Sequence, residues 1–322
     1  MTLSRRDTLK FLPAVFASAS IVSAMQAAAA PLTYSLKPEK LTDGIWVLRG
    51  AQEAISIENG GAIANVSIID TSAGAVIVDT GPSHRFGEAL ALLAKDLTGK
   101  PVARVYNTHF HPDHVMGNQA FDAEKIAAPQ GVVDGLKILG NAFADNMYRT
   151  AGDWMRGTEV VLPGTILNSE PEDFGDRRIR PLAMRGHTGS DLVLFDETSG
   201  FMFTGDLVFL DRAPTTPHAD IERWRQTLAN LGGIPFERLI PGHGPAEESV
   251  RGIEQTRAWL EAIEQIIRDA FEKGLDITEA IALPLPAWTE KIALARYEFE
   301  RTVMHLYPKL EAARWPRVDS KG

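Results

Sequence analysis

The stretch Asn107-Thr108-His109-Phe110-His111-Pro112-Asp113-His114 places three imidazoles and one carboxylate directly after an apolar run at residues 102–106. Imidazole nitrogens and carboxylate oxygens are ligands that suit zinc, with iron or manganese as alternatives. A single ion cannot easily bind all four of these side chains. The stretch therefore predicts a site for two neighbouring metal ions in the loop that follows a β-strand, whereas the alternative is a histidine-rich surface loop.

Three downstream segments each carry one further candidate ligand close to glycine. They are Arg185-Gly186-His187-Thr188-Gly189-Ser190-Asp191, Phe203-Thr204-Gly205-Asp206-Leu207 and Ile240-Pro241-Gly242-His243-Gly244-Pro245. Glycine lets the backbone turn sharply, so that short side chains can meet at one point. Five of the eight histidines thus fit one constellation. We expect the other three to be ordinary residues, namely His84, His218 and His305.

The order and spacing of these residues resemble the metallo-β-lactamase superfamily of binuclear hydrolases. The wider motif, which continues to Gly117-Asn118, resembles its glyoxalase II form, and the resemblance extends over roughly residues 45–245. It implies an α/β fold, a four-layer αββα sandwich, with an additional C-terminal helical segment.

The resemblance also implies a ligand set for two zinc ions. One ion would be held by His109, His111 and His187, and the other by Asp113, His114 and His243, with Asp206 bridging the two. The class B1 β-lactamases carry cysteine where this chain has Asp206, and the chain contains no cysteine. The resemblance therefore points to hydrolases with a bridging carboxylate, although iron or manganese could replace zinc.

The implied reaction is hydrolysis of a carbonyl compound by a hydroxide that two zinc ions share. Asp113 would orient this hydroxide as well as bind metal, which makes it the expected catalytic residue. The serine-hydrolase pattern Gly-x-Ser-x-Gly is absent from the sequence, in agreement with a metal-activated water. The substrate is expected to be a small molecule, namely a thioester, a lactone or an amide such as a β-lactam.

Three other functions stay open at this point. The same histidine motif occurs in mononuclear iron dioxygenases that act on persulfides. A true metallo-β-lactamase would fit an exported protein, but Asp206 argues against it. A non-catalytic metal-binding protein is the third, and the complete ligand set argues against that.

The N-terminal sequence predicts export. Ser4-Arg5-Arg6-Asp7-Thr8-Leu9-Lys10 precedes an apolar run at residues 11–25 and an alanine string at residues 27–30, which is typical of a twin-arginine signal. The apolar run is too short to span a bilayer, so we expect cleavage, no stable membrane anchor and a periplasmic location. The predicted division is a signal peptide at 1–30, a hydrolase domain at 31–250 and a C-terminal helical extension at 251–322.

Partners are predicted by charge and by a second resemblance. The formal net charge is −9 and no basic cluster lies outside the N-terminus, so we expect no nucleic-acid binding. The motifs also resemble exported zinc hydrolases linked to sulfur-oxidation and quinoprotein systems, which suggests such a periplasmic system as a partner. No pattern in the sequence specifies an oligomeric state.

Periodicity predicts where the secondary structure lies. Short β-branched runs predict strands of a first sheet, and later runs predict a second sheet. Helices are expected at 86–97, 221–231 and 247–273, and the helical segment 131–160 either walls the site or is a surface helix pair. Asp79 either forms a turn or orients a ligand histidine. The strands are expected at 45–48, 62–69, 75–78, 177–184, 192–195, 201–203 and 238–240.

Overall fold

The computed structural model describes residues 32–314, of which residues 33–314 belong to one compact unit. The predicted export signal, residues 1–30, lies outside the described residues. Between residues 32 and 314, no helix has the length and apolar character needed to cross a lipid bilayer.

The first half of the chain builds a seven-stranded sheet whose strands lie in sequence order. The strands are β1 (Pro38–Thr42), β2 (Ile45–Leu48), β3 (Val66–Thr71), β4 (Gly74–Val78), β5 (Val102–Tyr106), β6 (Ile126–Ala128) and β7 (Thr165–Ile166). Strands β1 to β4 pair antiparallel, and β4 to β7 pair parallel. Because parallel strands end at the same edge of a sheet, the loops after β4 and β5 meet there.

The second sheet has five strands in the order β12-β11-β10-β9-β8. They are β8 (Glu172–Asp173), β9 (Arg178–Met184), β10 (Asp191–Asp196), β11 (Phe201–Phe209) and β12 (Arg238–His243). All nine residues of β11 are buried, and it pairs in parallel with β12. The sheet therefore brings Asp206 and His243 onto neighbouring strands.

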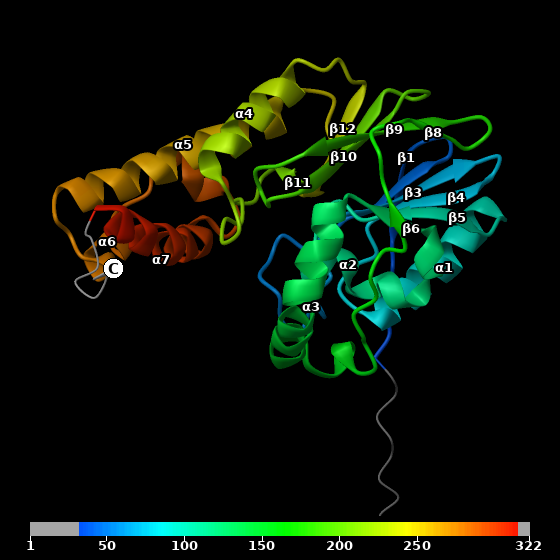
Figure 1. The fold of residues 1–322 in the computed structure, drawn as a ribbon, viewed down its shortest axis with the longest axis horizontal. Coiled ribbons are helices and arrows are strands. Elements are labelled where there is room, and N and C mark those ends of the chain that lie inside the picture. Colours follow the sequence, from blue (N-terminus) through cyan, green and yellow to red (C-terminus); the bar gives the residue numbers. More distant parts are fainter. Residues whose placement is uncertain (1–31, 315–322) are drawn as a thin grey trace, which may run out of the picture. The chain divides into compact units, whose positions relative to one another are not determined.

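Helices cover both sheets (Figure 1). The α-helices are α1 (His84–Thr98), α2 (Pro112–Val115), α3 (Gln130–Ala151), α4 (Ile221–Gly232), α5 (Arg251–Glu272), α6 (Ile277–Ile281) and α7 (Ala295–Arg314). Short 3₁₀ helices are η1 (Met116–Ala120), η2 (Ala123–Lys125), η3 (Gly152–Met155) and η4 (Ala287–Lys291).

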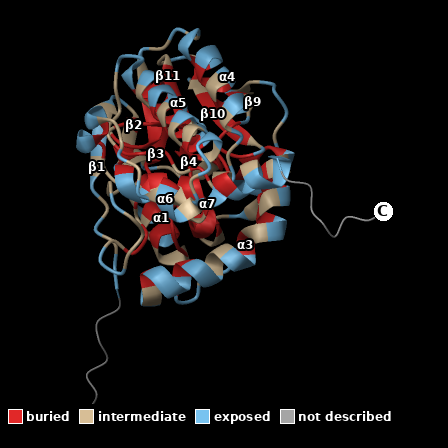
Figure 2. Ribbon diagram, turned by 90° about the vertical axis from the view of Figure 1, so that its left-hand side faces the viewer, coloured by how far each residue is buried: buried red, intermediate tan, exposed pale blue. Residues whose placement is uncertain are grey.

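The predicted αββα layers are confirmed by the way the core divides. Phe203 and Tyr106 belong to the apolar cluster between the two sheets, and Leu90 of α1 packs on the outer face of the first sheet. Trp224 of α4 and Leu260 of α5 belong to the cluster on the outer face of the second sheet. Figure 2 shows the buried strands between helices whose outer faces are exposed.

Two predicted boundaries are shifted for local reasons. The strand predicted at 62–69 begins only at Val66, because the Asn65 side chain donates to the carbonyls of Pro241 and Gly244, both at 2.8 Å. Residues 62–65 therefore reach the second sheet. Helix α1 begins at His84, because the Ser83 hydroxyl accepts a hydrogen bond from the N–H of Phe86 and caps the helix.

Helix α5 packs on the second sheet, α6 and α7 pack on α5, and the segment before α7 is tied to the loop after β11. The N–H of Ala213 donates to the carbonyl of Ala293, and the N–H of Ala293 donates to Asp211, both at 2.9 Å. Val303 and Tyr307 of α7 belong to the same apolar cluster as α5. The division into a domain and an extension at residue 250 stays a prediction.

Candidate metal centre

The seven predicted side chains come from four segments and meet in one place. The motif loop, residues 107–114, follows β5, and His187 lies in the turn between β9 and β10. Asp206 lies within β11 and His243 ends β12. All seven side chains are buried. The structure therefore assembles the whole predicted constellation, which makes a chance histidine-rich loop a poor explanation.

The motif loop is shaped by a one-turn helix and by buried amides. Pro112 occupies the first position of α2, where its missing N–H removes no intrahelical hydrogen bond. The side-chain amides of Asn107 and Asn118 bond to each other at 2.8 and 3.0 Å. The N–H of Thr80, at the end of the neighbouring strand, donates to the carbonyl of His114 at 2.7 Å. These bonds hold the loop against the sheet edge.

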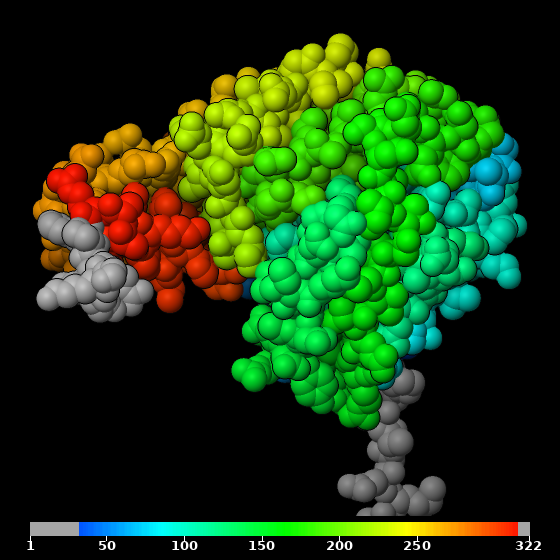
Figure 3. Space-filling model, viewed as in Figure 1, coloured from blue at the N-terminus to red at the C-terminus, as the bar shows by residue number. Residues whose placement is uncertain are grey.

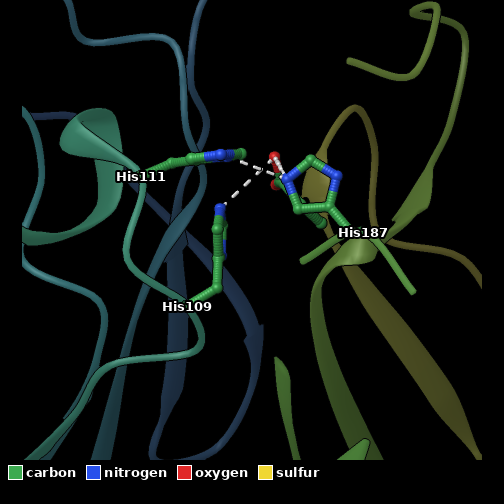
Figure 4. Close-up of side chains that lie close together, drawn as sticks. His109, His111 and His187 are labelled. Carbon is green, nitrogen blue, oxygen red and sulfur yellow. Dashed lines mark hydrogen bonds and ion pairs between the residues drawn. The ribbon is translucent and has the colours of Figure 1, made fainter. Parts of the chain in front are cut away.

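The first group of ligand atoms comes from His109, His111, His187 and Asp206, and all of them lie within 4.8 Å of one another. Nε2 of His187 lies 2.9 Å from Nδ1 of His111 and 3.3 Å from Oδ2 of Asp206. Nε2 of His109 lies 3.7 Å from the same oxygen. The three imidazoles point toward one another (Figure 4), as ligands of one cation would.

The second group comes from Asp113, His114 and His243, with ligand atoms again within 4.8 Å of one another. Oδ2 of Asp113 lies 3.4 Å from Nε2 of His243 and 3.6 Å from Nε2 of His114. Two nitrogens and one oxygen thus converge beside the first group.

Asp206 faces both groups. Its Oδ1 lies 3.1 Å from Nε2 of His114 and 3.3 Å from Nε2 of His243, whereas its Oδ2 faces the first group. Gly242 permits this position, because a Cβ atom at Gly242 would lie 2.0 Å from Oδ1 of Asp206. The glycine of the Pro-Gly-His segment is therefore required by close approach to the carboxylate.

Unsatisfied buried atoms show that this donor set fits cations. Nε2 of His109, Nε2 of His114 and Oδ1 of Asp206 are buried and form no hydrogen bond. Buried polar atoms of this kind are rare without a partner. Burial also lowers the pKa of His109, His111 and His187, and nearby histidines reinforce the shift for all three. Their imidazoles are therefore neutral, which is the form that binds metal.

The second group has a different electrostatic character. Burial alone would lower the pKa of His114, but the carboxylates of Asp206, Asp113 and Asp79 together raise it well above its usual value. The pKa of His243 is raised by Asp206 and Asp113 against the effect of burial. Burial opposes ionisation of Asp113 and Asp206, but the surrounding histidines hold both pKa values low. In this group, protons and metal therefore compete for the imidazoles.

The non-ligand nitrogens of three histidines have partners that fix the rings. Nδ1 of His114 donates to Asp79 at 2.7 Å, and Nδ1 of His243 donates to the carbonyl of Ile63 at 2.8 Å. Nδ1 of His109 lies 3.0 Å from the hydroxyl of Thr108. Such partners orient ligands and raise metal affinity. Of the two predicted roles for Asp79, the geometry supports the orientation of a ligand histidine.

His218 was expected to be an ordinary residue, but the structure places its Nδ1 2.9 Å from Nε2 of His111. Nothing in its sequence neighbourhood indicated this contact, because the two residues are distant in the chain. Only the fold, which returns the segment after β11 to the motif loop, reveals it.

A cavity of about 310 Å³ opens on these groups. It is lined by metal-group residues, by Phe143 and Asn146 of α3, and by Arg301 and His305 of α7. Figure 3 shows a hollow between the red atoms of α7 and the green atoms of α3. Helix α3 thus walls the site, one of its two predicted roles. The sequence predicted that His243 is the last residue of the site. The cavity extends beyond it in the chain, because residues of α7 form part of its wall.

Comparison with known proteins agrees with the predicted family and fold. The sequence model described as the metallo-beta-lactamase superfamily matches residues 59–243. The chain is 26% identical over 232 residues to the human acyl-coenzyme A thioesterase MBLAC2, and the match covers 64% of this chain and 80% of the relative. It is 36% identical over 271 residues to a linear primary-alkylsulfatase of a Pseudomonas species, covering 67% of this chain and 49% of the relative.

A hydroxyacylglutathione hydrolase of Gloeobacter violaceus is 26% identical over 169 residues, covering 52% of this chain and 56% of the relative. The chain thus spans only about half the length of this hydrolase and of the alkylsulfatase. Among solved structures, a metallo-beta-lactamase from Pontibacter korlensis superposes with a TM-score of 0.57 at 20% identity, covering 70% of this chain and 99% of that one. This likeness supports the fold.

Proposed function

From the premise that this chain belongs to the metallo-beta-lactamase superfamily of hydrolases, we propose that it is a binuclear zinc hydrolase that cleaves thioesters. The observation that carries the proposal is the position of Asp206, whose two oxygens face two separate groups of ligand atoms. A carboxylate so placed would bridge two ions.

The donor set favours zinc. Five imidazoles and two carboxylates, without any thiolate, suit zinc, and iron or manganese would be weaker alternatives. His109, His111 and His187 would hold one ion, Asp113, His114 and His243 the other, and Asp206 would touch both. When bound, such a pair supplies a water of lowered pKa and a Lewis acid for a carbonyl oxygen.

The chain's own residues would place the substrate and the attacking water. The pKa of Asp113 is held low, because His114 and His243 outweigh the effect of burial, so its carboxylate is ionised and can accept a proton from a water. Ile55, Ile63 and Phe143 line the same cavity and form an apolar surface for an acyl chain. Exclusion of water by such a wall strengthens the electrostatic interactions inside.

Thioesters are the first choice of substrate because of the relatives. Two relatives at 26% identity are named as an acyl-coenzyme A thioesterase and a hydroxyacylglutathione hydrolase. Acyl-coenzyme A and hydroxyacylglutathione are both thioesters. Lactones and β-lactams share the same carbonyl chemistry and follow in that order. A sulfate ester is a second candidate, because the alkylsulfatase relative is 36% identical.

We further propose that the protein acts in the periplasm after twin-arginine export and cleavage near residue 30. The support is the N-terminal sequence, with Arg5-Arg6 before an apolar run and an alanine string. A periplasmic sulfur-oxidation or quinoprotein system would then be its functional context.

Metal content and a substrate panel test the proposal together. Elemental mass spectrometry of the mature protein should give about two zinc ions per chain, and thioesters should be hydrolysed faster than lactones, nitrocefin or alkyl sulfates. One iron per chain with oxygen consumption on persulfides would replace the proposal by a dioxygenase. Preferred turnover of nitrocefin or of an alkyl sulfate would keep the metal centre but overturn the substrate class.

A further inference from the structure

The cavity has a second polar wall that the proposed chemistry does not use. Arg212 follows β11, whereas Glu298 and Arg301 lie on α7, and all three side chains line the same cavity as Asp113 and His243. None of the three belongs to either group of candidate metal ligands. The wall therefore needs an explanation of its own.

Arg212 is a buried cation with free hydrogen-bond donors. Its side chain is 3% exposed, and its Nε and Nη1 atoms are buried without any hydrogen-bond partner. Its Nη2 lies 3.9 Å from Oε1 of Glu298, which is too long for a hydrogen bond. A guanidinium is always charged and offers five N–H donors, so leaving it unpaired in the interior is costly.

Glu298 does not satisfy Arg212, because it is already committed to other donors. Its carboxylate accepts from the Thr215 hydroxyl at 2.9 Å and from Nη1 of Arg301 at 3.0 and 3.2 Å. Glu298 is fully buried, whereas Arg301 is about one-third exposed. Two guanidinium groups thus face one carboxylate, which leaves one positive charge in excess in this wall.

The excess charge lies next to the candidate metal centre. The ring of Phe209 stacks on His243 with centroids 5.0 Å apart, and the guanidinium carbon of Arg212 lies 5.8 Å from the centroid of the same ring. One aromatic ring therefore contacts both the ligand histidine and the buried guanidinium of Arg212. Because Arg212 and His243 line the same cavity, a substrate bound there can contact both residues.

The backbone that holds this wall is in an unusual conformation. Asp211 has φ 58° and Leu294 has φ 60°, and these two residues flank the backbone bridge between Arg212 and Ala293. Between residues 32 and 314 only one other non-glycine residue has a positive φ, namely Asp79. Left-handed backbone costs energy in such residues and concentrates at functional sites. The backbone on both sides of the Arg212–Ala293 bridge is therefore strained, as backbone at functional sites often is.

We propose that Arg212 and Arg301 form a subsite for an oxyanion on the substrate, so that the preferred substrate is a carboxylated or sulfated compound and not a neutral ester. A carboxylate or sulfate can accept paired hydrogen bonds from a guanidinium and would neutralise the excess charge. The reaction assumed for this substrate rests on the proposed hydrolase function, whereas the anion subsite does not.

The test compares pairs of substrates in which a carboxylate is replaced by its neutral methyl ester. One pair is the butanoyl thioesters of 3-mercaptopropionate and of its methyl ester, in which the anion lies on the leaving thiol. Another is the glutaryl and monomethylglutaryl thioesters of N-acetylcysteamine, in which it lies on the acyl chain. An alkyl sulfate carries the anion on the reacting group. The proteins are zinc-loaded wild type, Arg212→Gln, Arg301→Gln and, as matched control on α7, Arg296→Gln, whose side chain pairs with Glu300.

For the wild type we expect at least about a tenfold higher kcat/KM for the charged member of one pair, mainly through KM. Arg212→Gln and Arg301→Gln should bring that ratio toward one, Arg212→Lys should keep part of it, and Arg296→Gln should retain it. Because Arg301 is partly exposed, its variant keeps the test valid even if Arg212→Gln does not fold. A ratio near one in the wild type, or an unchanged ratio in both glutamine variants, overturns the subsite.

Calorimetry separates this proposal from the proposed function. The uncleavable thioether analogues of the same pairs, with and without the carboxylate, are titrated into the same proteins. If no thioester is cleaved but the carboxylated thioether binds the wild type more tightly than the neutral one, and Arg301→Gln removes the difference, the subsite stands and the thioesterase does not. Equal binding of the charged and neutral thioethers counts against the subsite.

Discussion

Oδ2 of Asp79 lies 2.7 Å from Nδ1 of His114 and also accepts a hydrogen bond from the Thr108 hydroxyl at 2.8 Å. That hydroxyl in turn lies 3.0 Å from Nδ1 of His109. One buried carboxylate, itself no candidate ligand, thus orients a ligand histidine in each of the two metal groups.

Replacing Asp79 by Asn should weaken metal binding without unfolding the protein. Asn tolerates the left-handed backbone that Asp79 adopts at φ 62°, so the main chain should be retained. Loss of the negative charge behind His114 should reduce zinc affinity by about 10- to 100-fold. Competition with a chromophoric chelator measures this. Exposed Asp153→Asn is the control, and equal affinities in both variants would mean that Asp79 only shapes the turn.

Replacing Asp206 by Ala should remove about one zinc per chain and lower kcat at least 100-fold, because both groups lose a shared oxygen. The far-UV circular dichroism should stay unchanged. Elemental mass spectrometry and initial rates measure the two effects. Unchanged metal content would show that Asp206 merely forms part of the strand.

Gly242→Ala should reproduce part of the Asp206→Ala effect from a residue that binds no metal. The added Cβ would lie 2.0 Å from Oδ1 of Asp206 and 2.7 and 2.8 Å from backbone atoms of Gly205 and Asp206, so the carboxylate and its strand have to move away from His114 and His243. We expect zinc loss from the second group with a smaller loss from the first. Gly99→Ala is the control, since no atom lies within 4 Å of the Cβ position there, although its φ of 68° will cost some stability. Full zinc content in Gly242→Ala would show that the close approach of Gly242 to Asp206 does not matter for metal binding.

His218→Ala should weaken metal binding in the first group, because Nε2 of His111 loses its partner at 2.9 Å. A reduction of roughly tenfold is expected for zinc, as for other partners of ligand histidines. His84→Ala, which removes a histidine that pairs with Glu88 outside the site, should leave affinity unchanged. If His84→Ala and His218→Ala behaved alike, the contact to His111 would have no role in metal binding.

Acid should remove the two proposed zinc ions in sequence. The pKa values of His114 and His243 are raised, so in the metal-free protein they keep their protons to higher pH and compete with zinc sooner as pH falls. The pKa values of His109, His111 and His187 are lowered, so protons reach them only in stronger acid. Dialysis across a pH series followed by zinc analysis should show two steps, with the second group emptied first. A single step would contradict this order.

The sequence was sufficient to predict the constellation because its residues are chemically specific and closely spaced. Four of the seven candidates lie in one short loop, and glycine accompanies the other three. The αββα layers and the C-terminal helices were also predicted, through β-branched runs, helical periodicity and the resemblance. Boundaries failed where a side chain overrode the pattern, as at Asn65, whose amide bonds to the second sheet.

Periodicity could not predict the second wall of the cavity. Arg212 and Glu298 are distant in sequence, and each alone reads as an ordinary charged residue. Their meeting depends on the backbone bridge between Arg212 and Ala293, which only the fold specifies. The contact of His218 with His111 was missed for the same reason.

The place of α7 in the wall has a consequence for the order in which the site is completed. Translation proceeds from the N-terminus, so His243 and every earlier ligand are synthesised before α7 exists. We expect the nascent chain to load zinc through the side that α7 later closes, so that uptake of radioactive zinc is fast during synthesis and slow in the finished protein. Equal rates would contradict this. If the chain is exported in its folded form, its metal would then be chosen inside the cell, by the ions present at the ribosome.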